Sequence, residues 1–319
     1  RQHMSQRTYW TGMISTGAES EQPGPPFKGA GWTADLAAQR WNPDRIHKGK
    51  EIVLRASSWV AAQQALNLIQ GCHQLLRGNP QVFQVQGIAH NAREPEWMSP
   101  EKRSQQAEWS WGASDIPLAC VVGAKASRRL RWVYAVAKYA FSMSIYSVHD
   151  MDIKPWLAPH LSLSKFPDDH VMFSYAIVSA YSVVEDLKLS VEASAQRPSR
   201  INGRWNPDVL SDLESRLTKA GVNLREPLLW TARGPRRRLE KRRPLPPGLK
   251  APWSAGVVRD AEIPVVDAIA YAEWLRSAIA SHGVKELTSV LSPYDVSNVQ
   301  HLARRLLLEN LGFWRWHAS

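Results

Sequence analysis

The stretch PVVDAIAYAEWLRSAIASHG, residues 264–283, decides how the C-terminal half of this chain folds. Its apolar residues recur at helical spacing, which predicts a long helix with a buried face. Gly283 is a residue type that readily adopts the left-handed conformation, so the helix is expected to end in ASHG. The same stretch carries Arg276 and His282, with five residues between them.

Further helices are expected on both sides of this stretch. Residues 116–149 read as one long helix or two, and residues 169–194 as another, with Asp168 or Asp169 available as a cap. The segment 207–221 predicts a short amphipathic helix with Pro207 in its first turn and Gly221 past its end. A last helix is expected over 292–312, begun by Ser292 and Pro293 and stopped by Gly312.

The N-terminal third shows a different pattern. Residues 51–56 and 81–89 predict strands, residues 33–41 a short helical piece, and residues 59–78 a helix capped by Ser57 or Ser58. The polar stretch 90–114 is the expected domain boundary. We therefore predict a mainly α protein, with an accessory domain over residues 5–114 that contains a few strands and a helical bundle over residues 115–319. Residues 1–4 read as a cloning remnant.

The composition indicates an ordinary globular protein. Of its 319 residues 44% are hydrophobic and 22% charged, which argues against disorder. No apolar run approaches the roughly 18–20 residues of a membrane span, and no secretory signal is recognisable, so we expect a cytoplasmic protein. Cys72 and Cys120 have no zinc-type spacing and are expected to be buried free thiols.

Positive charge is concentrated in one segment. The net charge is +11, and residues 225–250 hold nine Lys or Arg against Glu226 and Glu240. Such a field attracts polyanions, although a solvated loop kept soluble by charge stays open as the alternative. The prolines interrupt any amphipathic helix, which makes a membrane surface the weaker choice. The predicted RNA-binding residues are Arg233, Arg236, Arg237, Arg238, Lys241, Arg242 and Arg243.

No common catalytic signature is present. Walker A, GxGxxG, HExxH and GxSxG patterns are missing from the sequence, and the ten histidines lack metal-ligand spacing, so we expect neither a metal nor another cofactor. Arg276 and His282 suit a phosphodiester, because arginine binds phosphate bidentately and histidine transfers protons near neutral pH. On a regular helix the two side chains would sit about 120° apart and roughly 9 Å along the axis. They converge only where the helix loosens or ends.

The segment resembles the defining motif of the HEPN superfamily, an arginine and a histidine separated by four to six residues. Its frequent form is Arg-Asn-x-Ile-Ala-His-Gly. The positions that match are Arg276, Ile279, Ala280, His282 and Gly283, while Ser277 stands where asparagine is common and Ser281 is one extra residue. The resemblance covers roughly 116–316 and implies a four- to five-helix bundle, with a basic insertion at about 225–258.

The resemblance implies a metal-independent endoribonuclease that leaves a 2′,3′-cyclic phosphate. His282 would be the general acid/base and Arg276 would stabilise the pentavalent phosphate, oriented by Glu185 or Asp186 in SAYSVVEDLKL. Family members usually form homodimers with composite active sites and often serve prokaryotic antiphage defence or toxin systems, in which a regulatory protein partner is possible. The alternatives are a non-catalytic helical nucleic-acid-binding module and a structural dimerisation module.

The last helix and the tail carry further candidates. His301, Arg304 and Arg305 are expected to form the polar face of the helix, although Arg304 could instead contact RNA. Trp314 and Trp316 are expected to pack the tail, although both could instead stack on bases.

Overall fold

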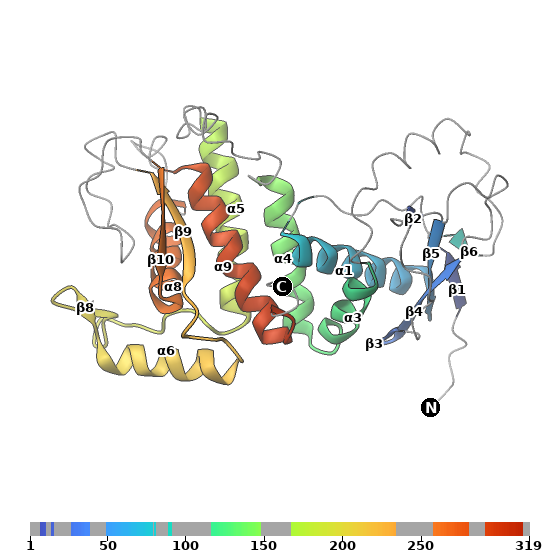
Figure 1. The fold of residues 1–319 in the computed structure, drawn as a ribbon, viewed down its shortest axis with the longest axis horizontal. Helices are drawn as coiled ribbons and strands as arrows, with labels where there is room; N and C mark the ends of the chain where they lie inside the picture. Colours follow the sequence, from blue (N-terminus) through green and yellow to red (C-terminus); the bar gives the residue numbers. More distant parts are fainter. Residues whose placement is uncertain are drawn as a thin grey trace. The chain divides into compact units, whose positions relative to one another are not determined.

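The computed structural model describes ten segments of the chain, namely residues 7–10, 14–15, 27–38, 49–78, 80, 89–90, 116–147, 167–233, 258–280 and 291–314 (Figure 1). Most of these residues are helical, which confirms the mainly α class. The chain forms two compact units: Arg1–Arg77 with Gln81–Val133, and Gly78–Pro80 with Tyr134–Ser319. Of the expected boundary at 90–114 only His90 is described, and residues 116–133 belong to the first unit.

The first unit contains an antiparallel sheet with the strand order β3-β4-β5-β1-β6, in which β2 also pairs with β5. The strands are β1 (Arg7–Trp10), β2 (Ile14–Ser15), β3 (Phe27–Gly29), β4 (Trp32–Ala38), β5 (Gly49–Ala56) and β6 (Ala89–His90). The predicted strand at 51–56 is confirmed as part of β5. The strand expected at 81–89 lies outside the described residues except for its last position, which begins β6.

The helical piece expected at 33–41 was wrong, because residues 33–38, the described part of this stretch, belong to β4. Trp32 and Ala34 are buried while Thr33 and Asp35 are half-buried, so the burial alternates with the two-residue period of a strand. Every residue of β4 pairs with β5. Alanines at 34, 37 and 38 favour a helix locally, and the pairing with a neighbouring strand overrides that preference.

The described part of the first unit also contains the helices α1 (Trp59–Arg77) and α3 (Ile116–Ala126), which pack against each other. Of the two predicted caps Ser58 is the one used, since its hydroxyl accepts from the Ala61 amide at 3.1 Å. A Cβ on Gly123 would lie 3.3 Å from the Ile69 side chain, so glycine permits the close approach of α3 to α1. Cys72 and Cys120 are buried free thiols, as predicted.

Five α-helices lie in the second unit or extend into it: α4 (Leu130–Ile145), α5 (Pro167–Asp186), α6 (Pro207–Lys219), α8 (Val265–Trp274) and α9 (Pro293–Leu311). The segment 116–149 is thus two helices, α3 and α4, within its described part. Helices α5 and α9 run side by side (Figure 1). Buried polar contacts join three helices, because the Ser142 hydroxyl of α4 donates to the Ala176 carbonyl of α5 and accepts from Gln300 of α9.

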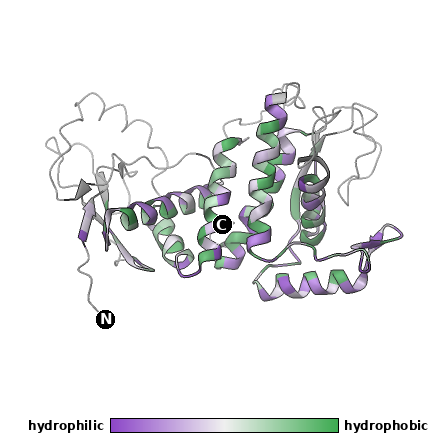
Figure 2. Ribbon diagram, turned by 180° about the vertical axis from the view of Figure 1, so that it is seen from behind, coloured by the Kyte–Doolittle hydropathy of each residue, from purple (hydrophilic) through white to green (hydrophobic). Residues whose placement is uncertain are grey.

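Local signals set the ends of α6 and α9 as predicted. Ser292 and Asp295 form a capping box at the start of α9, and Gly312 ends it in the left-handed conformation with φ of 79°. Helix α6 begins at Pro207 and has apolar residues on one side only, which the two-coloured ribbon of Figure 2 displays. Its buried residues Val209, Leu213 and Leu217 recur at helical spacing.

The described part of the second unit also contains two small antiparallel hairpins. One consists of β7 (Arg200–Ile201) and β8 (Arg204–Trp205), the other of β9 (Leu228–Arg233) and β10 (Val258–Ile263). The basic insertion expected at about 225–258 therefore contains strand β9 within its described part, directly after the turn at residues 225–227. Trp230 of β9 is buried and packs edge-to-face on Tyr271 of α8 with ring centroids 5.4 Å apart.

None of the helices in the described part of the chain has the length and apolar character needed to cross a membrane.

Candidate active site around Arg276

The helix that carries Arg276 changes its geometry at that residue. Regular α-helix ends at Trp274, and Leu275–Ala280 form a π-helical segment, η3. Such wide turns are rare and frequently occur at functional sites. The sequence analysis expects the helix to end in ASHG, of which only Ala280 is described, and the described part of the helix is already wider from Leu275 onward. His282 and Gly283 lie outside the described residues, so the histidine half of the pair stays a prediction.

Arg276 forms an ion pair with one of the two candidate acidic residues. Its Nη2 lies 3.0 Å from Oε1 of Glu185 in the last turn of α5, which packs against η3. Both side chains are 37% exposed. An ion pair this exposed contributes about 0–1 kcal/mol to stability. Its main consequence is geometric, because it fixes a guanidinium at the protein surface where an anion can reach it.

Asp186 contacts a different element. Its carboxylate accepts a hydrogen bond of 2.8 Å from Lys138 Nζ of α4. Glu185 and Asp186 are adjacent in sequence and cannot face the same direction at the end of one helix. The structure thus separates two residues that the sequence left as alternatives, with Glu185 beside Arg276 and Asp186 tied to α4.

The sequence analysis did not identify Glu273 and Tyr181, two further groups that interact electrostatically with Arg276 and Glu185. Burial raises the pKa of Glu273 to about 7, with nearby Glu185 adding to the rise and Arg276 opposing it. Burial also raises the pKa of Tyr181, and the charges of Glu273 and Glu185 add to that effect. A spacing signal was available, because Tyr181 stands four residues before Glu185 and Glu273 three residues before Arg276, which are same-face spacings on a helix.

The predicted RNA-binding residues are described only in part. Arg233 ends β9, where its backbone pairs with Val258 of β10. Outside the described residues lie Arg236, Arg237, Arg238, Lys241, Arg242 and Arg243. The hairpin β9–β10 therefore brackets the basic stretch in sequence, and the contribution of those six side chains to RNA binding stays a prediction.

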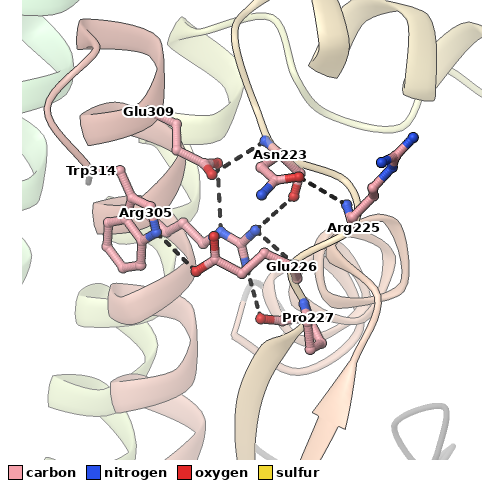
Figure 3. Close-up of polar contacts among 7 residues, drawn as sticks. All are labelled: Asn223, Arg225, Glu226, Pro227, Arg305, Glu309 and Trp314. Atoms are coloured by element: carbon pink, nitrogen blue, oxygen red, sulfur yellow. Dashed lines mark hydrogen bonds and ion pairs between the residues drawn. The ribbon is translucent and has the colours of Figure 1, made fainter. Parts of the chain in front are cut away.

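The expected polar face of the last helix was wrong for Arg305, which is 1% exposed. Its guanidinium donates to the carbonyl oxygens of Asn223, Glu226 and Pro227 at 2.8–2.9 Å, as Figure 3 shows. Its Nε lies 3.5 Å from Oε2 of Glu309 one turn later. Backbone carbonyls and a buried carboxylate compensate the desolvation of this charge. Arg305 thus holds the segment that leads into β9.

The C-terminal tail packs against the same segment. Trp314 donates from Nε1 to Oε1 of Glu226 at 3.1 Å (Figure 3). The guanidinium carbons of Arg304 and Arg305 lie 5.6 and 5.9 Å from its ring centroid. The predicted packing role is confirmed for Trp314. Trp316 lies outside the described residues.

Arginine, carboxylates and a tyrosine give this site the chemistry of anion binding and proton exchange. In the ranges that the structure covers, no three His, Cys, Asp or Glu side chains gather into a possible metal site. Comparisons of the chain with profiles of protein families, with curated proteins and with solved structures gave no match.

Proposed function

We propose that this protein is a metal-independent endoribonuclease of the HEPN type. One observation carries the proposal: the Arg276–Glu185 ion pair at the π-helical start of the Arg-x5-His segment. The resemblance assigns an arginine and an earlier acidic residue to one active site. Residues 185 and 276 are far apart in sequence, and their contact supports that assignment.

In the proposed reaction the ribose 2′-oxygen attacks the adjacent phosphorus while the bond from phosphorus to the 5′-oxygen breaks. The 2′-hydroxyl loses a proton, the 5′-oxygen gains one, and the products are a 2′,3′-cyclic phosphate and a 5′-hydroxyl. His282 moves these protons. Arg276 stabilises the negative charge that develops on the phosphoryl oxygens.

Glu185 is the positioning residue for Arg276. It bonds Nη2 of the guanidinium and so fixes the orientation of a group whose planar geometry matches that of a phosphate. Asp186 is excluded from this role in our proposal because its carboxylate pairs with Lys138.

RNA is the proposed partner, and the basic stretch after β9 supplies affinity without sequence preference. Phosphate contacts of this kind are electrostatic. They weaken as the salt concentration rises, because the release of counterions from the RNA on binding is then less favourable. By the resemblance we further propose a homodimer with a composite site, acting in the cytoplasm in antiphage defence or as a toxin, with a regulatory protein as a second partner.

A non-catalytic nucleic-acid-binding module is the second candidate, and the net charge of +11 favours it equally. Incubation with a 5′-labelled RNA in EDTA separates the two. The proposed enzyme leaves fragments with 2′,3′-cyclic phosphate and 5′-hydroxyl ends, which acid treatment and a polynucleotide kinase reveal. Intact RNA that is retarded in a gel would instead establish a binding module.

A further inference from the structure

The turn that joins α3 to α4 carries a concentration of positive charge within the first unit (Figure 1). Residues 116–133 contain four basic residues and no Asp or Glu. We call these four, Lys125, Arg128, Arg129 and Arg131, the turn cluster. None of them belongs to the basic stretch after β9, on which the predicted RNA binding has rested so far.

Hydrogen bonds hold the backbone of this turn in place from two sides. The Ser127 hydroxyl donates to the Ala124 carbonyl of α3 at 2.8 Å and accepts from the Ala30 amide, between β3 and β4, at 2.8 Å. The amides of Arg128 and Arg129 donate to carbonyl oxygens in the last turn of α3 at 3.2 Å. The turn is thus tied both to α3 and to the sheet, and it presents the arginines from a fixed support.

Two arginines of the turn cluster are available to a ligand. Arg128 and Arg129 are exposed, and in the described part of the chain their side chains form no hydrogen bond or ion pair. The guanidinium carbon of Arg129 lies 4.5 Å from the ring centroid of the buried Trp132. Stacking of this kind orients the planar guanidinium and leaves the N–H groups at its edge to an outside acceptor.

The position of these charges is unfavourable for the protein by itself. Arg129 directly precedes α4 and Arg131 lies in its first turn, which contains no acidic residue. The positive end of the helix dipole disfavours cations there, whereas Lys125 in the last turn of α3 is placed favourably. The neighbouring arginines also repel one another. A bound polyanion would relieve both effects, and local rules of stability are typically broken at functional sites.

We propose that the turn cluster binds the phosphate backbone of a nucleic acid, which makes the first unit a nucleic-acid-binding module. Arginine suits this ligand because its guanidinium donates two parallel hydrogen bonds to one phosphate. That the nucleic acid is RNA rests on the proposed function, whereas the phosphate contact does not.

A membrane surface fits the turn cluster less well than a nucleic acid does. Adsorption to a bilayer needs a broad apolar face beside the positive charges. In residues 122–133, all of which the structure describes, Leu130 is the only large apolar side chain that is exposed, at 72%. One leucine among arginines gives an apolar contact for a base rather than a face that inserts into lipid.

Fluorescence anisotropy with the full-length protein and a short, labelled 2′-O-methyl RNA tests the proposal, because this probe lacks the hydroxyl that cleavage requires. Arg128→Gln combined with Arg129→Gln is expected to reduce the slope of log affinity against log salt by about 1.4, at roughly 0.7 per single-strand phosphate contact. In about 0.1 M salt this corresponds to an affinity roughly ten- to thirtyfold lower. Arg128→Lys combined with Arg129→Lys keeps both charges and should stay within about threefold of wild type.

Arg204→Gln combined with Lys219→Gln is the matched control, since it removes two charges from exposed positions of the second unit. This control should change the affinity less than about twofold, because salt screens charges that lie away from the bound phosphates. An equal loss in the control, or wild-type affinity in the double glutamine variant of the turn, overturns the proposal.

Arg128→Gln alone covers the case in which the loss of stacking on Trp132 unfolds the double variant. The Arg128 side chain forms no hydrogen bond, ion pair or ring contact in the described part of the chain, so its replacement leaves the fold intact. The salt slope is expected to fall by about 0.7. An unchanged slope in this folded variant overturns the proposal as well.

Two further probes identify the partner. Weaker binding of a single-stranded DNA of the same sequence supports RNA as the ligand, and tighter binding of the DNA supports the phosphate contact but assigns it to DNA. Vesicles that contain anionic phospholipid test the membrane. If they bind the wild type and not the double glutamine variant, while both proteins bind the nucleic acids equally, the proposal is overturned.

Cleavage of unmodified RNA is measured separately, so that the two proposals fail separately. If the wild type leaves this RNA intact, the ribonuclease proposal ends and the anisotropy data decide on the turn cluster by themselves. Cleavage by the wild type together with an unchanged affinity in the double glutamine variant overturns the role of the turn cluster and leaves the ribonuclease standing.

Discussion

Nη2 of Arg276 lies 3.0 Å from Oε1 of Glu185, across the contact between η3 and the last turn of α5. The pair joins two helices at the point where one of them widens from α to π geometry. Because both side chains are partly exposed, the pair holds a cationic group where a substrate can reach it. The proposed chemistry depends on this arrangement.

The first prediction separates Glu185 from its neighbour. Glu185→Gln is expected to lower kcat for RNA cleavage about ten- to a hundredfold with little change in KM, because Arg276 loses the group that orients it. Asp186→Asn is the control, since it alters the adjacent carboxylate, which bonds Lys138. Steady-state kinetics on one RNA measure both, and equal losses in the two variants would contradict the assignment.

The second prediction concerns the buried arginine of α9. Arg305→Met is expected to lower the free energy of unfolding by about 3–5 kcal/mol, because Glu309 and three backbone carbonyls lose their cationic partner. Urea titration followed by circular dichroism measures the loss. The double variant Arg305→Met, Glu309→Gln should recover part of it, while Arg276→Ala should cost about 1 kcal/mol or less.

The third prediction uses the pH dependence of stability. Burial, with Arg304 and Arg305 nearby, lowers the pKa of His301 from 6.5 to about 4. Between these values the unfolded chain binds a proton that the folded protein does not, so stability falls as the pH falls from 6.5 to 4. Urea titrations at several pH values in this range measure the free energy of unfolding. As the pH falls from 6.5 to 4, this free energy should decrease by about 2–3 kcal/mol less in His301→Gln than in wild type. If the free energy of unfolding has the same pH dependence in both proteins, His301 is not the cause of the loss.

The fourth prediction tests the basic stretch. Replacing Arg236, Arg237 and Arg238 by alanine is expected to reduce the slope of log affinity against log salt by about 2, at roughly 0.7 per single-strand phosphate contact. Fluorescence anisotropy with a short RNA measures the slope. Alanine at the exposed Lys28, Lys188 and Lys219 removes the same charge, and an equal change there would show that only the net charge matters.

Local signals account for what could be predicted from the sequence. Ser292 and Gly312 mark the ends of α9, and Pro207 the start of α6, because caps act on the residues next to them. The stretch at 33–41 was misassigned because its strand depends on pairing with β5, which lies further along the chain. Residues 228–233 were read as part of a basic loop for the same reason, since β10 is their partner.

The residues of the candidate site also fall into two groups, those that a sequence motif identifies and those that only the folded structure brings together. Arg276 and the acidic pair at 185 and 186 follow from a motif, while the choice of Glu185 needs the packing of α5 on η3. Arg305 looked like a surface residue because arginine usually is one, and its carbonyl partners at 223–227 lie about eighty residues earlier. Glu273 and Tyr181 carry no motif, and their altered pKa values arise from burial in the fold.

The most direct test of the ribonuclease proposal is the cleavage of RNA in EDTA by the wild-type protein, Arg276→Ala and His282→Ala, at equal concentration and with folding checked by circular dichroism. The proposal predicts cyclic phosphate ends with wild type and a rate at least about a thousandfold lower in both variants. Wild-type cleavage that stops in EDTA, or that persists in His282→Ala, would contradict it.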